Sequence, residues 1–176
     1  MAPAALALDI DGTIDTADKQ QLSRLNNAAR RLGVPRYINT ARSNAYCHAP
    51  DRLTTKLCPR SKHHCLVSND VPYSKLVNMR KIQKHARVRD PACVMLIDDR
   101  PENIQKINSN GYTGIRVQDT TGIRRETVDE AIETMRLCAS NPKGRGVPDN
   151  VDVRLRARLF IIVLIAILLI AYLMLL

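Results

Sequence analysis

The chain has 176 residues, a formal net charge of +10 and 45% hydrophobic residues, which is enough apolar sequence for a packed domain and argues against global disorder. Aromatic residues make up only 3%, which argues against base stacking as the main mode of nucleic-acid recognition. The positive charge indicates acidic partners such as nucleic acid, anionic lipid or a phosphorylated substrate, although a basic surface with no special partner gives the same composition.

Short apolar runs alternate with helical periodicity along residues 1–140, which we interpret as one domain. The apolar runs predict strands at 4–9, 36–40, 65–68, 93–97 and 113–117. The helical spacing predicts helices at 18–32, 74–86, 101–110 and 125–138, the second of them with Ser74 as its N-cap. Strands that alternate with helices predict an α/β fold, with a parallel sheet of about five strands covered by helices on both faces.

The C-terminal part of the chain differs in composition from this domain. Residues 141–158 are basic and contain Pro and Gly, as is typical of a linker. Residues 159–176 are uncharged and would form a helix of about 27 Å, just enough to cross a membrane. Because Arg154, Arg156 and Arg158 precede this segment, we expect a single-pass tail anchor with the domain facing the cytosol. A core helix or an oligomer seam is the alternative.

Polar side chains stand at the carboxyl ends of the predicted strands, where ligands collect in parallel sheets. They are four acids, one hydroxyl and one lysine: Asp9, Asp11, Thr40, Lys75, Asp98 and Asp99. The first two could be ordinary turn residues after a strand. Four acids at one edge, however, repel one another unless a cation is bound. Mg²⁺ fits this edge because it prefers carboxylate and phosphate oxygens.

Four motifs in this order resemble those of the haloacid dehalogenase superfamily of phosphohydrolases, over roughly residues 4–118. Asp9, Asp11, Gly12 and Thr13 match its Asp-x-Asp-Gly-Thr motif after a strand. The remaining three motifs are matched by Thr40 in INTAR, by Lys75 in YSKLVNM, and by Asp98 with Asp99 in MLIDDRPENI. The resemblance implies the Rossmann-like fold of that family over the predicted domain.

The resemblance also implies a phosphatase mechanism. Asp9 would be the nucleophile that forms an aspartyl-phosphate, and Asp11 would protonate the leaving oxygen and then activate water. Gly12 would let the backbone turn sharply toward the phosphate, which Thr13 and Thr40 would contact. The chain would then hydrolyse phosphomonoesters, although transfer of the phosphoryl group to another acceptor stays open.

The same resemblance implies a magnesium site. Asp9, the Asp11 backbone carbonyl and an acid of the Asp98/Asp99 pair would hold Mg²⁺, and the sequence leaves open which acid of the pair contacts the metal. Lys75 would balance the negative charge of carboxylates and phosphate. Lys81 and Lys84 compete for this role, but a position in the first turn of the helix favours Lys75.

The segments into which members of that family insert substrate-selecting caps are short here, namely 12–17 and 68–73. We therefore expect an open site and a phosphorylated substrate that is a small molecule, a nucleic-acid end or a phosphoprotein. The alternative to an enzyme is a non-catalytic, basic, membrane-bound scaffold that recruits nucleic acid or another partner. The sequence predicts no oligomeric state.

Cysteine and histidine are dense between the second and third predicted strands: Cys47, His48, Cys58, His63, His64 and Cys65. This density could bind zinc, but no spacing matches a common finger, so an irregular helix–loop insert is favoured, with Cys65 inside a strand. The five cysteines of the chain do not form an even set, and we expect a cytosolic domain to keep them reduced.

Three further polar residues lie beside the motifs. Arg42 follows Thr40 and could bind substrate, although a solvated arginine is the favoured interpretation. Arg100 and Asn103 follow the acid pair and could orient the loop or contact substrate, with a structural capping role for Asn103 equally open.

Overall fold

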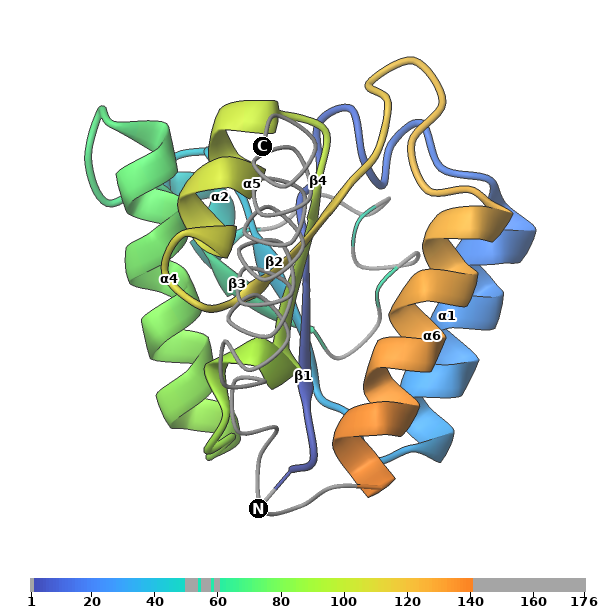
Figure 1. The fold of residues 1–176 in the computed structure, drawn as a ribbon. Coiled ribbons are helices and arrows are strands. Elements are labelled where there is room, and N and C mark those ends of the chain that lie inside the picture. Colours follow the sequence, from blue (N-terminus) through green and yellow to red (C-terminus); the bar gives the residue numbers. More distant parts are fainter. Residues whose placement is uncertain (1, 50–53, 55–57, 59–60, 141–176) are drawn as a thin grey trace, which may run out of the picture. The chain divides into compact units, whose positions relative to one another are not determined.

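The strands of the computed structural model, which describes residues 2–49, 54, 58 and 61–140, form one parallel sheet (Figure 1). The five strands are β1 (Ala5–Leu8), β2 (Arg36–Asn39), β3 (Lys62–His64), β4 (Val94–Asp98) and β5 (Thr113–Arg116). Their order across the sheet is β3-β2-β1-β4-β5, and all pairs are parallel. The predicted α/β class and the five-stranded parallel sheet are confirmed.

Helices cover both faces of the sheet, as predicted. They are α1 (Lys19–Arg31), α2 (Asn44–His48), α4 (Val71–Ala86), α5 (Pro101–Asn108) and α6 (Arg125–Ser140), with a 3₁₀ turn η1 (Pro91–Cys93) before β4. Helices α4 and α5 pack together on one face, and α1 and α6 on the other (Figure 1). The N-cap of α1 is Asp18, whose carboxylate accepts the amides of Gln20 and Gln21.

The two central strands fix the position of the acids. Every residue of β1 and β4 is buried, as expected for strands covered on both faces. Their register pairs Leu8 with Ile97, and the Asp9 amide donates to the Ile97 carbonyl at 2.9 Å. Asp9 and Asp98 therefore leave the sheet side by side at its carboxyl edge.

The third strand differs from the prediction of 65–68. Strand β3 is Lys62–His64, which pairs with β2 at the edge of the sheet. The prediction was wrong because an edge strand needs no continuous apolar run, whereas the apolar residues that follow belong to a loop in which Val67 is 44% exposed. Cys65, predicted inside a strand, lies just after β3.

Helix α4 begins at Val71, three residues before the predicted start. Its N-cap is Asp70, whose carboxylate accepts the Tyr73 amide, and not Ser74. The Ser74 hydroxyl is buried and instead donates to the Ser68 carbonyl at 3.0 Å. Lys75 consequently lies in the second turn of the helix and not in its first.

The cysteines are a further correction, because two disulfides join four of them. Cys47 pairs with Cys65 and Cys93 pairs with Cys138, which leaves Cys58 as a buried thiol. The expectation of reduced thiols was wrong for these four residues, because the fold brings together cysteines that are 18 and 45 residues apart in the sequence. Two of the six residues considered as zinc ligands are thus engaged with each other.

The predicted linker and anchor, 141–158 and 159–176, lie outside the described residues. Within the residues that the structure does describe, no helix is both long enough and apolar enough to cross a membrane.

Candidate active site

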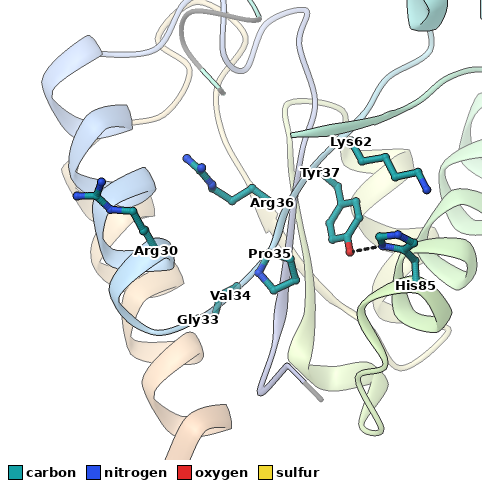
Figure 2. Close-up of a pocket in the computed structure, with 8 residues that line it drawn as sticks. All are labelled: Arg30, Gly33, Val34, Pro35, Arg36, Tyr37, Lys62 and His85. Atoms are coloured by element: carbon teal, nitrogen blue, oxygen red, sulfur yellow. Dashed lines mark hydrogen bonds between the residues drawn. The ribbon is translucent and has the colours of Figure 1, made fainter. Parts of the chain in front are cut away.

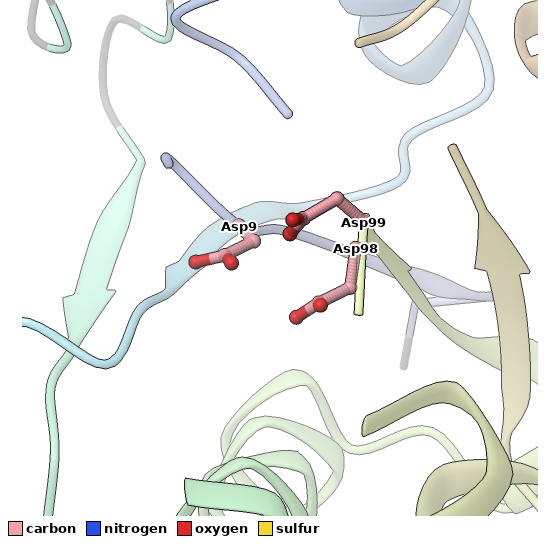
Figure 3. A group of neighbouring side chains, drawn as sticks. All are labelled: Asp9, Asp98 and Asp99. Atoms are coloured by element: carbon pink, nitrogen blue, oxygen red, sulfur yellow. The ribbon is translucent and has the colours of Figure 1, made fainter. Parts of the chain in front are cut away.

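Three carboxylates meet at the carboxyl edge of β1 and β4 (Figure 3). Asp9, Asp98 and Asp99 each offer one oxygen, and these oxygens lie within 4.8 Å of one another. Asp9 and Asp98 are 5% and 0% exposed, whereas Asp99 is partly exposed. We refer to these three residues as the acid cluster.

Lys75 supplies the positive charge at the acid cluster. Its Nζ lies 2.7 Å from Asp9 Oδ1 and 3.0 Å from Asp98 Oδ2, and the side chain is 1% exposed. A buried lysine of this kind needs carboxylate partners, because an unpaired charge in the interior is costly. The structure thus brings Lys75 together with three of the four predicted acids.

Two asparagines hold Lys75 in place, and sequence analysis missed both. The Asn39 amide donates to the Lys75 carbonyl at 3.1 Å, and Lys75 Nζ in turn donates to the Asn39 carbonyl. Asn78, one turn after Lys75 on α4, donates to Asn39 Oδ1 at 3.1 Å and to the Cys65 carbonyl at 2.9 Å. The only available signal was the presence of amide side chains among apolar neighbours.

The two acids of the pair have different surroundings. Asp98 Oδ1 accepts from the Arg100 amide and from Asn103 Nδ2, both at 2.9 Å, and Oδ2 accepts from Asn103 at 3.1 Å. Asn103 therefore orients the Asp98 side chain in this structure. Asp99 Oδ1, by contrast, is buried and has no hydrogen-bond partner among the described residues.

The turn after β1 brings the backbone against Asp99. Gly12 has φ of +70°, a conformation that favours glycine, and a Cβ there would lie 2.8 Å from Asp99 Oδ2. The Ile10 carbonyl accepts the Thr13 and Ile14 amides, which closes the turn. Thr13 is fully buried, and its Oγ1 has no hydrogen-bond partner among the described residues.

The Asp11 carboxylate lies outside the acid cluster. Arg42 binds it with two hydrogen bonds, from Nη2 to Oδ1 at 2.6 Å and from Nε to Oδ2 at 3.1 Å, and the guanidinium carbon lies 4.7 Å from the centre of the Tyr46 ring. The Arg42 amide donates to Thr40 Oγ1 at 3.3 Å. Arg42 is thus partly exposed, as a solvated arginine would be, but it is also engaged with both Asp11 and Thr40.

Burial and neighbouring charges shift the pKa values of these acids in opposite directions. Burial raises the pKa of Asp9 to about 6, with Lys75 opposing the shift and Asp98 adding to it. Burial and the charge of Asp98 raise the pKa of Asp99. The hydrogen bonds from Arg42 hold the pKa of Asp11 below its usual range, so the pKa values of the two acids of the Asp-x-Asp motif are shifted in opposite directions.

The donor set of the acid cluster fits a hard divalent cation. Three carboxylates face a single lysine, so the cluster carries excess negative charge when its acids are ionised. The buried, unpartnered Asp99 Oδ1 and the second oxygen of Asp9 are oxygen donors of the kind that Mg²⁺ prefers. Asp98 accepts from Asn103 with both oxygens and pairs with Lys75 through Oδ2. Asp98 therefore fits better as the residue that holds these two side chains than as a metal ligand.

A pocket of about 320 Å³ opens beside the acid cluster at the end of β5. Its lining comes from the start of α5 and from the segment that follows β5, and it includes Asp99, Arg100, Arg116 and Asp119. The pocket therefore adjoins the acid cluster through Asp99, and its wall carries both arginines and acids, Glu102 among them.

Comparisons with known proteins identify a shared fold but no family. No model of a known family matches the chain, and no curated protein gives a significant match. Among solved structures, the chain is similar to an uncharacterized protein from Corynebacterium glutamicum, with a TM-score of 0.54 and 17% sequence identity. The match covers 75% of this chain and 94% of the other. At this identity the similarity concerns the fold alone.

Proposed function

We propose that the chain is a magnesium-dependent phosphatase of the haloacid dehalogenase type, which hydrolyses phosphomonoesters through an aspartyl-phosphate on Asp9. One observation carries the proposal. The residues of three separate motifs, Asp9, Lys75 and the Asp98–Asp99 pair, meet at one edge of the sheet, and Lys75 bridges Asp9 and Asp98 within 3.0 Å. A structural ion pair alone would not require a third acid with an unpartnered oxygen.

In the proposed reaction, a carboxylate oxygen of Asp9 attacks phosphorus, and the bond from phosphorus to the ester oxygen breaks. The leaving oxygen takes a proton from Asp11. Water then attacks the phosphorus of the aspartyl-phosphate and gives a proton to Asp11, which releases inorganic phosphate and restores the Asp9 carboxylate. Because Arg42 holds Asp11 ionised in this structure, Asp11 has to leave Arg42 and take up a proton from solvent before it protonates the leaving oxygen.

The other residues of the site bind and orient the phosphoryl group. Mg²⁺ held by Asp9, Asp99 and the Asp11 carbonyl would neutralise charge on the phosphoryl oxygens. Lys75 keeps the Asp9 carboxylate oriented through its ion pair, and Asp98 keeps Lys75 in place. Thr13 and Thr40 hydroxyls would donate to phosphoryl oxygens at the strand ends.

The pocket beside Asp99 is the space that suits the leaving group. It lies next to the acid cluster, and its wall carries Arg100 and Arg116 beside Asp99, Glu102 and Asp119, so it suits a polar leaving group. Both arginines are exposed, which is compatible with an open site that admits a small ester, a nucleic-acid end or a phosphoprotein.

Hydrolysis of para-nitrophenyl phosphate by the full chain in nonionic detergent tests the proposal. We expect Mg²⁺-dependent turnover that falls by at least about 10³-fold in Asp9→Asn and in Asp11→Asn. Asp15→Asn is the matched control, because Asp15 is an exposed acid of the same loop. Activity that survives Asp9→Asn, or no activity on this ester or on phosphorylated nucleotides, nucleic acids and peptides, would favour the non-catalytic scaffold instead.

We further propose that residues 159–176 anchor the chain in a membrane. The support is their 18 uncharged residues behind three arginines. Alkaline carbonate extraction of membranes should leave the full chain in the pellet, and protease added to sealed vesicles should digest a cytosol-facing domain. Disulfides are typical of oxidising compartments, which would favour the opposite orientation. A domain that is protected from the protease would show that orientation and contradict the proposed one.

A further inference from the structure

Basic and acidic residues are unevenly divided between the two halves of the sheet. From residue 19 to residue 89 the sequence has sixteen Lys and Arg but only two acids, Asp51 and Asp70. From 90 to 140 it has six Lys and Arg and nine acids. The first stretch supplies β2, β3, α1 and α4, and β3 and β2 are one side of the sheet. Within these four elements there is no Asp or Glu, so their charged residues are all basic.

A pocket of about 340 Å³ gathers part of this charge at the amino ends of β2 and β3 (Figure 2). Arg30 at the end of α1, Arg36 on β2, Lys62 on β3 and His85 on α4 line it. Among the described residues that line the pocket, none carries a carboxylate. Because the acid cluster lies at the carboxyl ends of the strands, this basic pocket is a separate site.

Hydrogen bonds hold two of the side chains at the floor of the basic pocket, and two others at its rim are exposed. The Tyr37 hydroxyl is hydrogen-bonded to His85 Nδ1 at 2.8 Å, which joins β2 to α4 across the pocket. Arg36 donates to Asn26 Oδ1 at 2.7 Å, which orients its guanidinium. Arg30 and Lys62 are exposed, so a ligand can reach them without a change in the fold.

The positive charge continues from the basic pocket onto α4. His64, the last residue of β3, has its pKa lowered to about 4 by burial and by the nearby charges of Lys62 and Lys81. Lys62 and Lys81 thus both lie close enough to His64 to lower its pKa, and both are exposed. We define the basic surface as the cations of this pocket together with the exposed Lys81 of α4.

Helix capping explains only part of this charge. Arg30 and His85 are in the last turns of α1 and α4, where positive side chains complement the helix dipole. Arg36 and Lys62 are on strands, and this reason does not apply to them. Lys81 lies before the last turn of α4 and has no acid on its own helix to pair with.

We infer that the basic pocket binds the phosphate backbone of a nucleic acid, independently of the base sequence and of the proposed phosphatase activity. Backbone phosphates recur along a strand, so they match cations that extend from the pocket onto α4. Tyr37 is 2% exposed and cannot stack on a base. An anionic membrane is disfavoured, because the cations come from elements on both faces of the sheet and do not point in one direction (Figure 2).

Fluorescence anisotropy with a labelled 20-nucleotide DNA of mixed sequence tests the inference. The full chain in nonionic detergent is titrated in EDTA, so that hydrolysis does not alter the probe. We expect Lys62→Glu/Lys81→Glu to weaken binding at least about tenfold and to lower the slope of log K against log salt, by about 0.7 for each phosphate that the variant no longer neutralises. Lys106→Glu/Arg136→Glu, which changes the net charge equally at exposed positions outside the basic surface, should bind as the wild type does.

Three outcomes would overturn the inference. Equal losses in the two double variants would indicate a general effect of net charge, and no binding by the wild type would exclude the site. Binding to phosphatidylserine vesicles that excess DNA does not displace would assign the surface to a membrane. If circular dichroism shows that the glutamate variant is unfolded, Lys62→Gln/Lys81→Gln repeats the comparison with a smaller perturbation. Loss of phosphatase activity in Asp9→Asn with unchanged DNA binding separates this inference from the proposed function.

Discussion

The two ends of the sheet carry opposite charge in opposite surroundings. At the carboxyl end, Asp9, Asp98 and Lys75 are almost fully buried and bind one another. At the amino end, Arg30 and Lys62 line an open pocket and are exposed. The difference shows that charge at the acid cluster is part of the fold, because burial makes each ion depend on its partners. At the basic pocket, by contrast, the exposed side chains of Arg30 and Lys62 are accessible to a ligand.

The largest expected effect is that of Lys75→Met. It leaves two buried carboxylates without their cation and should lower the free energy of unfolding by about 3–5 kcal/mol at neutral pH. Lys81→Met, at an exposed lysine on the same helix, should change it by less than about 0.5 kcal/mol. Urea unfolding followed by circular dichroism measures both.

The same pair of variants tests the metal site. If a divalent cation binds the acid cluster, Mg²⁺ should stabilise Lys75→Met more than the wild type, because the cation takes over the role of the lysine. Equal stabilities of the two variants would contradict the contrast between the ends of the sheet.

The next largest effect on stability is expected from the two disulfides, of which one lies near each end of the sheet. Cys93–Cys138 precedes β4 and Cys47–Cys65 follows β3, and they close loops of 45 and 18 residues. Loop-closure entropy sets upper bounds of about 4 and about 3 kcal/mol on their stabilisation. Replacing each pair by serine should therefore cost more at the amino end. In reducing buffer the variants and the wild type should converge, and an intact mass with five free thiols would refute both cross-links.

The buried charge of Asp9 should also make stability depend on pH. Its pKa rises from 3.8 to about 6 on folding, so the folded state keeps this proton to higher pH than the unfolded state. The associated stability is present below about pH 4 and is lost as pH rises through 6, by on the order of 3 kcal/mol. As pH rises from about 4 to above 6, the free energy of unfolding of the wild type should fall by this amount relative to that of Asp9→Asn.

Mg²⁺ should reduce this loss, because a cation beside Asp9 favours its ionised form. Urea unfolding at a series of pH values, with Mg²⁺ and with EDTA, measures the difference. A difference between wild type and Asp9→Asn that does not vary with pH would contradict the raised pKa.

The smallest effect is expected at the basic pocket. Tyr37→Phe removes the hydrogen bond to His85 and should cost about 1 kcal/mol, measured by thermal unfolding. Phe keeps the buried ring and removes only the hydroxyl. DNA binding should therefore weaken only if the Tyr37–His85 hydrogen bond orients His85 toward the DNA. Tyr73→Phe is the control, since Tyr73 is 47% exposed. An equal cost in both variants would show that the floor of the pocket is not held by this bond.

Local sequence patterns were sufficient to predict the strands that are buried on both faces of the sheet. The apolar runs before Asp9 and Asp98 predicted β1 and β4, and the alternation of strands and helices predicted a parallel sheet. The pattern failed at β3, because an edge strand has a polar sequence and its apolar neighbours lie in a loop. It also failed at the start of α4, where Asp70 and Pro72 marked the first turn more reliably than Ser74 did.

The sequence by itself determined which acids stand at strand ends, because strand ends follow from hydrophobic runs along the chain. Only the tertiary structure decided how their charges are shared. Lys75 reaches Asp9 and Asp98 because β1, β4 and α4 meet there, whereas Asp11 turns to Arg42. The cross-links and the basic pocket depend likewise on residues far apart in the sequence, since contacts through space are set by packing and not by local preference.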